Sequence, residues 1–231
     1  MIILMAKLPL SKINQLVKAE GFIQVHFIKG YKYIDRAGEL VNFFHGENKT
    51  PPSFSMSMSG LTIRKPRENV AEIKVSSTDF WAHFIAPDSL EVMEDFFRPN
   101  ADAITKTLEI ADVQRVGWRI FFVHEFGAKE ERDAALKKFV PLENLEFGEV
   151  YFVSKIGDVS LNIRIRNVVK TEEDDDEQDE GNSVPGILID VDFYKKFDEA
   201  LPSAKLLVEL ESLKSAAKSA DFLKLVNDIL A

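Results

Sequence analysis

The sequence predicts an α+β protein, in which helices pack on one face of an antiparallel β-sheet, or of two such sheets. Two patterns support this class. Segments such as 113–125, 159–169 and 187–194 alternate apolar and polar residues with the period of a strand. Segments 88–108 and 203–230 instead space their apolar residues three or four apart, as on one face of a helix. A chain of 231 residues that is 45% hydrophobic and 29% charged can bury such a core.

The first half of the chain is expected to supply most of the strands. Ser53–Ser59 alternates without a break, and the alternation changes phase at Gly60, where a bulge or turn fits. Glycines and prolines separate several of the other strand-like runs. The predicted strands of this half are Phe22–Ile28, Tyr31–Ile34, Leu40–Phe44, Ser53–Ser59, Val70–Ser76, Phe80–Ile85 and Val113–Glu125.

Four segments are predicted to be helical. The helix near residue 90 has the clearest start, since Asp88 can cap it and Glu91 follows three positions later. Pro99 is expected to kink or divide this helix, because proline has no N–H to donate. The other predicted helices are Ser11–Glu20, Lys129–Phe139 and a C-terminal amphipathic tail from about Ser203 to Leu230.

The final third predicts a long β-hairpin with an acidic tip. Val150–Lys155 and Val159–Val169 are strands joined by a tight turn at Gly157. Residues 172–180 are the acidic run, and the alternating strand 187–194 follows it. The helical tail then completes the chain.

The register of this hairpin is predicted by matching its apolar faces, because a slip of one residue would turn every side chain to the other face. Two registers, two residues apart, satisfy the match. We predict the one that also places arginines opposite aspartates, since such cross-strand pairs contribute about 0.2–1 kcal/mol each. The predicted pairs are Ile165 with Val191, Ile163 with Phe193, Arg166 with Asp190 and Arg164 with Asp192.

The domain organisation is predicted to be a single α+β domain over residues 1–231. Strands followed by helices occur twice along the chain, which leaves open two similar halves at about 1–127 and 128–231. No repeat of individual residues supports the duplication. Covering a sheet with helices is common enough to produce the same pattern.

Charge is concentrated in one short segment. The chain carries a net charge of −9, and residues 172–180, EEDDDEQDE, contain eight acidic groups and no basic one. The remainder is almost neutral and shows no basic stripe, which argues against nucleic-acid binding. The run, centred on Asp174, Asp175 and Asp176, is either a solvated loop or an acidic interaction loop for a basic partner, as in a defence accessory.

Several classes of protein are disfavoured by what the sequence lacks. It has no cysteine, so it has no disulfide, no thiolate nucleophile and no cysteine-bound zinc. It shows no phosphate loop, no GxGxxG and no HExxH, and we therefore predict no cofactor and no metal. The apolar start is too short for a signal peptide, and no stretch is apolar enough to span a bilayer. A cytoplasmic protein without membrane contact is expected.

The leading functional hypothesis is a non-enzymatic protein- or peptide-binding module that uses exposed apolar sheet surface. Phenylalanine is unusually abundant, at 18 residues, and most such rings fill a core. A partner surface requires several apolar side chains to be exposed together. The partner would be a protein, a peptide or a second copy of the chain. The candidate binding residues are Phe54, Met56, Met58, Phe121 and Phe122.

The alternative hypothesis is an enzyme or metal-binding protein with an unrecognised site. Three histidines fall within predicted strands, and two aspartates share one strand face, which a hard cation could use. The structural explanation is stronger, because arginines opposite these aspartates would neutralise them. The residues concerned are His26, His83, His124, Asp190 and Asp192.

Four segments resemble a sporadically distributed bacterial family of uncharacterised proteins, over roughly residues 70–231. They are Trp81-Ala-His-Phe-Ile-Ala-Pro-Asp-Ser-Leu, Val113-Gln-Arg-Val-Gly-Trp-Arg-Ile-Phe-Phe, Ile187-Leu-Ile-Asp-Val-Asp-Phe-Tyr and Ser219-Ala-Asp-Phe-Leu-Lys-Leu-Val. The family shows a "vsRiGlRyiN" strand, an "lDiDvf" strand and an "in.aF..li" helix. Here Phe121-Phe122-Val123-His124 replaces "RyiNri". The resemblance implies a bacterial protein and brings no assigned activity. The layout is also similar to SecB-like export chaperones, which implies a chaperone-like role by analogy of fold alone.

Overall fold

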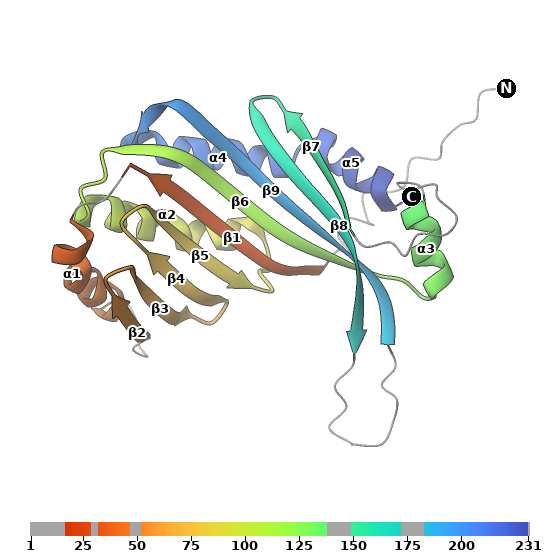
Figure 1. The fold of residues 1–231 in the computed structure, drawn as a ribbon, viewed down its shortest axis with the longest axis horizontal. Coiled ribbons are helices and arrows are strands. Elements are labelled where there is room, and N and C mark those ends of the chain that lie inside the picture. The colour runs from red at the N-terminus through yellow and green to blue at the C-terminus, as the bar shows by residue number, and fades with distance from the viewer. Residues whose placement is uncertain (1–16, 29–31, 47–51, 138–148, 172–182, 231) are drawn as a thin grey trace, which may run out of the picture.

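The computed structural model describes residues 17–28, 32–46, 52–137, 149–171 and 183–230. These residues form a nine-stranded sheet whose neighbouring strands all pair antiparallel. The strand order is β2-β3-β4-β5-β1-β6-β9-β8-β7 (Figure 1). The strands are β1 Val17–Phe27, β2 Ser53–Ser57, β3 Gly60–Arg67, β4 Val70–Val75, β5 Asp79–Ile85, β6 Asp112–Glu125, β7 Glu149–Ile156, β8 Val159–Thr171 and β9 Ser183–Pro202. The predicted α+β class with an antiparallel sheet is confirmed.

The helices gather on one side of this sheet (Figure 1). α2 contacts β1, and α4 contacts β6, β8 and β9. Over β1, β5, β6 and β9 the opposite side, which we call the helix-free face, is covered by no described helix (Figure 1). The helices are α1 Tyr33–Gly46, α2 Leu90–Thr107, α3 Lys129–Lys137, the 3₁₀ turn η2 Ser203–Lys205, α4 Leu206–Ala217 and α5 Ala220–Leu230. None of the described helices is both long and apolar enough to cross a membrane.

The core lies between the sheet and these helices, and strand alternation determines which side chains enter it. Ile23 of β1, Trp118 of β6 and Phe193 of β9 are at most 1% exposed and stand opposite one another in the strand register. Their neighbours along each strand point to the helix-free face because side chains alternate sides. The alternation along each central strand therefore shows which side chains point to the core and which to the helix-free face.

Two predicted strands are wrong: Leu40–Phe44 and the end of Tyr31–Ile34 belong to helix α1, and Tyr31 itself lies outside the described residues. Tyr33, Ala37, Leu40 and Phe44 are the buried residues of this helix. Their spacing of four, three and four is that of a helix face, and it is invisible when each short run is considered alone. The predicted helix Ser11–Glu20 is wrong over Val17–Glu20, which begin β1, and its first six residues lie outside the described part.

Helix α2 differs from prediction at its start and in its middle. Ser89 is its N-cap and accepts a hydrogen bond from Val92 N at 3.3 Å, whereas Asp88 was the expected cap. Either residue type suits the position, since both offer a short side-chain oxygen. Pro99 lies inside α2, which is one helix from Leu90 to Thr107 and is not divided.

The β8–β9 hairpin exists, but its predicted register is wrong by two residues. Ile163 stands opposite Val191 and Arg164 opposite Asp190, which is the other register that matches the apolar faces. Arg166 stands opposite Leu188. The charge argument failed because Asp190 and Asp192 take their arginines from β6, on the other side of β9.

One continuous sheet joins the first and second parts of the chain. β6 pairs with β1 on one side and with β9 on the other. The division into two similar halves stays a prediction. Residues 172–182, with Asp174, Asp175 and Asp176, lie outside the described residues, between the ends of β8 and β9.

Candidate functional site

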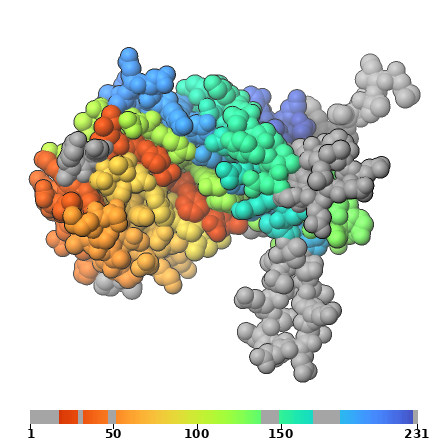
Figure 2. Space-filling view, viewed as in Figure 1, coloured from red at the N-terminus to blue at the C-terminus, as the bar shows by residue number. Residues whose placement is uncertain are grey.

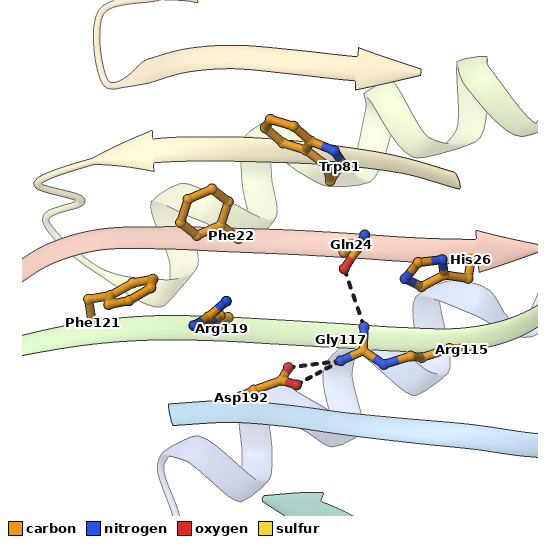
Figure 3. A pocket seen from close by; sticks show the side chains of 9 residues that line it. All are labelled: Phe22, Gln24, His26, Trp81, Arg115, Gly117, Arg119, Phe121 and Asp192. Carbon is orange, nitrogen blue, oxygen red and sulfur yellow. Dashed lines mark hydrogen bonds and ion pairs between the residues drawn. The ribbon is translucent and has the colours of Figure 1, made fainter. Parts of the chain in front are cut away.

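A pocket of about 390 Å³ lies on the helix-free face, where β5, β1, β6 and β9 run side by side. In the space-filling view of Figure 2, β1 and β6 are visible between β5 and the β8–β7 hairpin, with no helix in front of them. Four adjacent strands supply the walls (Figure 3). The lining residues are Phe22, Gln24, His26, Trp81, Arg115, Gly117, Arg119, Phe121 and Asp192.

Gly117 of β6 lies at the centre of the strand register in this region. It pairs with Gln24 of β1 on one side and with Tyr194 of β9 on the other. A Cβ atom built at Gly117 would stand 2.7 Å from Nη1 of Arg115. The absence of a side chain at this position therefore lets the Arg115 guanidinium lie across the strand.

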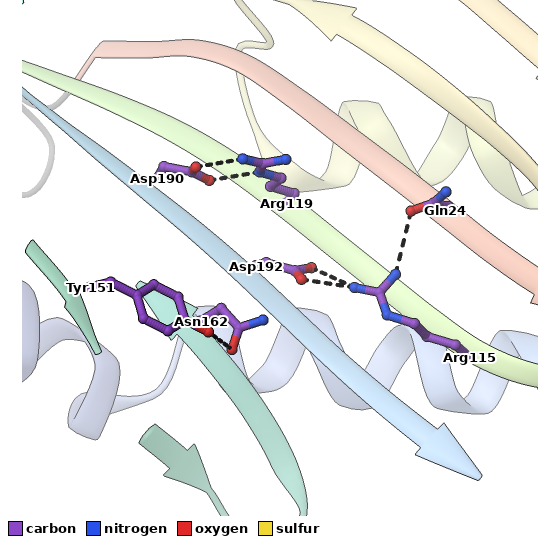
Figure 4. Close-up of polar contacts among 7 residues, drawn as sticks. All are labelled: Gln24, Arg115, Arg119, Tyr151, Asn162, Asp190 and Asp192. Atoms are coloured by element: carbon purple, nitrogen blue, oxygen red, sulfur yellow. Dashed lines mark hydrogen bonds and ion pairs between the residues drawn. The ribbon is translucent and has the colours of Figure 1, made fainter. Parts of the chain in front are cut away.

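The two arginines beside Gly117 are each held by an aspartate of β9 (Figure 4). Nη2 of Arg115 donates to both Asp192 oxygens at 3.0 and 2.8 Å, and Nη1 donates to Gln24 Oε1 at 3.4 Å. Nε and Nη2 of Arg119 donate to the two Asp190 oxygens at 2.7 and 2.6 Å. The hydrogen bond to Asp190 raises the pKa of Arg119 further above its ordinary value. Both guanidinium groups are thus fixed in orientation by charge-assisted hydrogen bonds.

Aromatic rings form the other wall of the pocket. The ring of Phe22 lies 6.1 Å from that of Trp81 and 5.9 Å from that of Phe121, both at steep angles. Outside the pocket lining, His83 stacks on Phe22 at 4.2 Å. The Arg119 guanidinium lies 4.8 Å from the Phe121 centroid, within the range of a cation–π contact. The aromatic wall of the pocket therefore borders the cationic group of Arg119.

His26 is a second pocket residue whose pKa departs from its ordinary value. Burial, and then the nearby charge of Arg115, lower its pKa from the ordinary value of 6.5. The imidazole is accordingly neutral near pH 7. Asp79 and Asp192 oppose this shift without reversing it.

The histidines of the alternative hypothesis do not converge. His26 lines the pocket, and His83 lies beside it with its Nε2 3.1 Å from Glu20 Oε2. His124 shares the face of Trp118 by strand alternation, on the opposite side of the sheet. Among the described residues no cluster of His, Cys, Asp or Glu is suited to a metal ion. Two of the five proposed residues, His26 and Asp192, do line one pocket.

The proposed apolar binding residues are distributed over two separate places. Phe121 lines the pocket, whereas Phe122 is 6% exposed and belongs to the core. Met56 and Met58 are 63% and 78% exposed at the β2 edge of the sheet, and Phe54 is partly buried there. Four strands separate β2 from β6. The five residues therefore do not form one patch.

Sequence reasoning missed most of the pocket. Arg115 and Arg119 belong to the alternating segment 113–125 but were given no role. Phe22, Gln24 and Trp81 gave no signal, because each is an ordinary polar or aromatic residue in an alternating strand. The one available signal was glycine between two arginines at 115, 117 and 119, a same-face row with its central side chain missing.

No family model matches the chain, and no curated protein matches it. The resemblance to the sporadically distributed bacterial family stays a prediction.

Proposed function

We propose that this protein is a non-enzymatic module that binds a peptide in the pocket over Gly117, on the helix-free face of its sheet. The observation that supports this function best is the composition of the pocket. Three aromatic rings and two oriented arginines, all partly exposed, line one hollow built from four paired strands. Tryptophan and arginine are enriched among the residues that contribute most to protein recognition.

The rigidity of these side chains strengthens the proposal. Binding costs about 0.5–1.5 kcal/mol for each flexible side chain that must be immobilised. Arg115 and Arg119 are already held by Asp192 and Asp190, so little of this cost remains. A surface arginine without such a partner would be more mobile, and binding would have to immobilise it.

The proposal includes a cytoplasmic location in a bacterium, which the absence of cysteine and the family resemblance support. A chaperone-like or defence-accessory role depends on which peptide is bound. Selection from a random library identifies that peptide without assuming its sequence.

The test is selection of peptides from a random library on the immobilised protein, followed by affinity measurements on purified peptides. Gly117→Val should weaken their binding at least about tenfold, because it fills the pocket and moves Arg115 away from Asp192. Arg164→Gln is the matched control, since Arg164 lies on the same face beside Tyr151 and outside the pocket. Circular dichroism checks that both variants fold.

Two results would overturn the proposal. One is the absence of any enriched peptide. The other is equal binding to wild type and Gly117→Val, which would place the peptide elsewhere on the protein.

An enzyme is the second candidate, because His26 and Asp192 line the same pocket and His26 is neutral. A neutral imidazole can accept a proton from a bound ligand. Mass spectrometry of a selected peptide after incubation distinguishes the two functions. A binding module returns the peptide unchanged, whereas a modified or cleaved product that disappears in His26→Gln supports the enzyme.

A further inference from the structure

We infer that the peptide bound by this pocket ends in an aromatic residue with a free C-terminal carboxylate. Its ring packs against Phe22, Trp81 and Phe121, and its carboxylate accepts from the outer edge of Arg119. This inference rests on the proposed function and specifies its ligand.

The position of the pocket in the sheet favours a chain end over a passing strand. β1 pairs with both β5 and β6, and β6 pairs with both β1 and β9. The main-chain groups of both strands are therefore used within the sheet, and a peptide cannot add to them as a further strand. The side chains of the pocket must therefore recognise the peptide. A C-terminal residue with an aromatic ring offers them both a ring and a charged carboxylate. A volume of about 390 Å³ is near the lower end for ligand sites and fits one or two residues.

The charged groups at the pocket cancel in formal charge, so an anion is not attracted there by net charge. Arg115 and Arg119 contribute two positive charges, Asp192 contributes one negative charge, and His26 is neutral near pH 7. Asp190, whose side chain is 4% exposed, is paired with Arg119 and offsets the remaining positive charge. The anion is consequently held by hydrogen-bond donors more than by a long-range field.

Arg119 has a donor in position for this purpose. Asp190 occupies Nε and Nη2, and no described residue accepts from Nη1. The side chain is 42% exposed and lies over the ring of Phe121. Hydrogen bonds to ionised groups are shorter and about twice as strong as neutral ones, so a carboxylate is the strongest acceptor a peptide can bring there.

The aromatic rings define the second requirement. Phe22 makes an interplanar angle of 59° with Trp81 and 68° with Phe121, so Phe22 is not stacked face to face with either ring. A further ring can pack against them at the 4.5–7 Å separation that aromatic pairs prefer. An aliphatic side chain would lack these edge-to-face contacts.

Trp81 provides a built-in reporter for the test. The chain has two tryptophans, and Trp118 is buried in the core at 1% exposure. In a Trp118→Phe background, fluorescence titration reports on the pocket alone, and calorimetry on the wild-type chain provides an independent measurement. The probes are acetyl-Gly-Gly-Phe with a free carboxylate, its C-terminal amide and acetyl-Gly-Gly-Ala with a free carboxylate.

The free acid ending in phenylalanine should bind at least about tenfold more tightly than either the amide or the alanine peptide. Arg119→Gln alone leaves the buried Asp190 carboxylate without its cation, so the test variant also carries Asp190→Asn. This pair should reduce the preference for acid over amide to less than about twofold. Arg164→Gln should retain the full preference.

Three results would overturn the inference, and only the first of them leaves the proposed function intact. The acid and the amide of the phenylalanine peptide could bind equally well, and both could lose binding in Gly117→Val. The pocket would then bind peptides without recognising their carboxylate. Uridine 5′-monophosphate could bind more tightly than the phenylalanine acid and lose this binding in the Arg119 and Asp190 variant. That result would identify the ligand as a nucleotide and not a peptide. Library peptides that bind the protein without changing Trp81 fluorescence would exclude this pocket as their site.

Discussion

At the scale of single residues, Gly117 is important because it has no side chain. Any side chain there would meet the guanidinium of Arg115, whose Nη1 would be 2.7 Å from the new Cβ. Because that nitrogen is the far end of a flexible chain, it would move, and the contact with Asp192 would be lost. We therefore expect substitutions at Gly117 to be folded and defective in binding. Glycine is present here for the space it leaves, and no unusual backbone angle is involved.

Trp118 supports a prediction about stability at the same scale. It is 1% exposed, and its Nε1 has no hydrogen-bond partner among the described residues. Trp118→Phe removes this unpaired N–H and keeps a ring, so we expect a loss of only about 1 kcal/mol in the free energy of unfolding. Trp118→Ala should cost about 3–5 kcal/mol through the cavity it leaves. Urea unfolding of both variants measures the difference, and equal losses would show that the indole N–H is bonded.

At the scale of elements, a charged cluster joins helices α2 and α4. The Glu94 side chain, 7% exposed, accepts from Lys214 of α4 and from Arg98 of its own helix. Burial alone raises the pKa of Glu94, but the hydrogen bonds from Lys214 and Arg98 outweigh it and lower this pKa below its ordinary value. Hydrogen bonds to Glu211 and Glu94 raise the pKa of Lys214. The cluster thus holds α4 against α2 through ionised groups.

This pKa shift predicts a pH dependence of stability. The contribution of Glu94 is complete above its unfolded pKa of about 4.3 and is lost as the pH falls through the lower folded pKa. We expect Glu94→Gln to destabilise the protein by about 1–3 kcal/mol at pH 7, and the difference from wild type to shrink between about pH 5 and pH 3. Urea unfolding at several pH values measures both effects.

Glu211→Gln is the control for this prediction. Glu211 contacts the same Lys214 and Arg98 but is 49% exposed, so its loss should cost less than about 1 kcal/mol. An equal effect of the two substitutions would contradict a special role for the buried carboxylate.

At the scale of the whole molecule, most of the net charge belongs to one connection between two strands. Removing residues 172–180 changes the net charge of the chain from −9 to −1. The ladder of β8 and β9 extends to the pair Thr171 and Ser183. After the deletion only Gly181 and Asn182 would join these two residues, and Gly-Asn is a favoured two-residue hairpin loop.

We therefore expect the deletion variant to fold, with a thermal midpoint within a few degrees of wild type. Its affinity for the selected peptides, measured at low and high salt, should be unchanged if the run is a solvated loop. Loss of binding at low salt alone would instead assign the run, centred on Asp174, Asp175 and Asp176, to an interaction with a basic partner. Circular dichroism and calorimetry provide the two measurements.

The amount of the fold that could be predicted varied with the length of each pattern. β6, with a regular alternation over 14 residues, was predicted almost to its ends. α1 was missed because its helical spacing was divided between two short apolar runs. The β8–β9 register was wrong because apolar matching allowed two solutions, and the aspartates that should have chosen between them bind Arg115 and Arg119 instead.

The sequence by itself determined which side chains share a face of each strand, because alternation is a local property with a period of two. Arg115, Gly117 and Arg119 on one side of β6 and Trp118 on the other follow from their positions alone. Only the tertiary structure decided that Gln24, 91 residues from Arg115, would lie within hydrogen-bonding distance of it. Strand order depends on contacts distant in the sequence, and it brought β5, β1, β6 and β9 together as neighbours. The pocket exists because those four strands are adjacent.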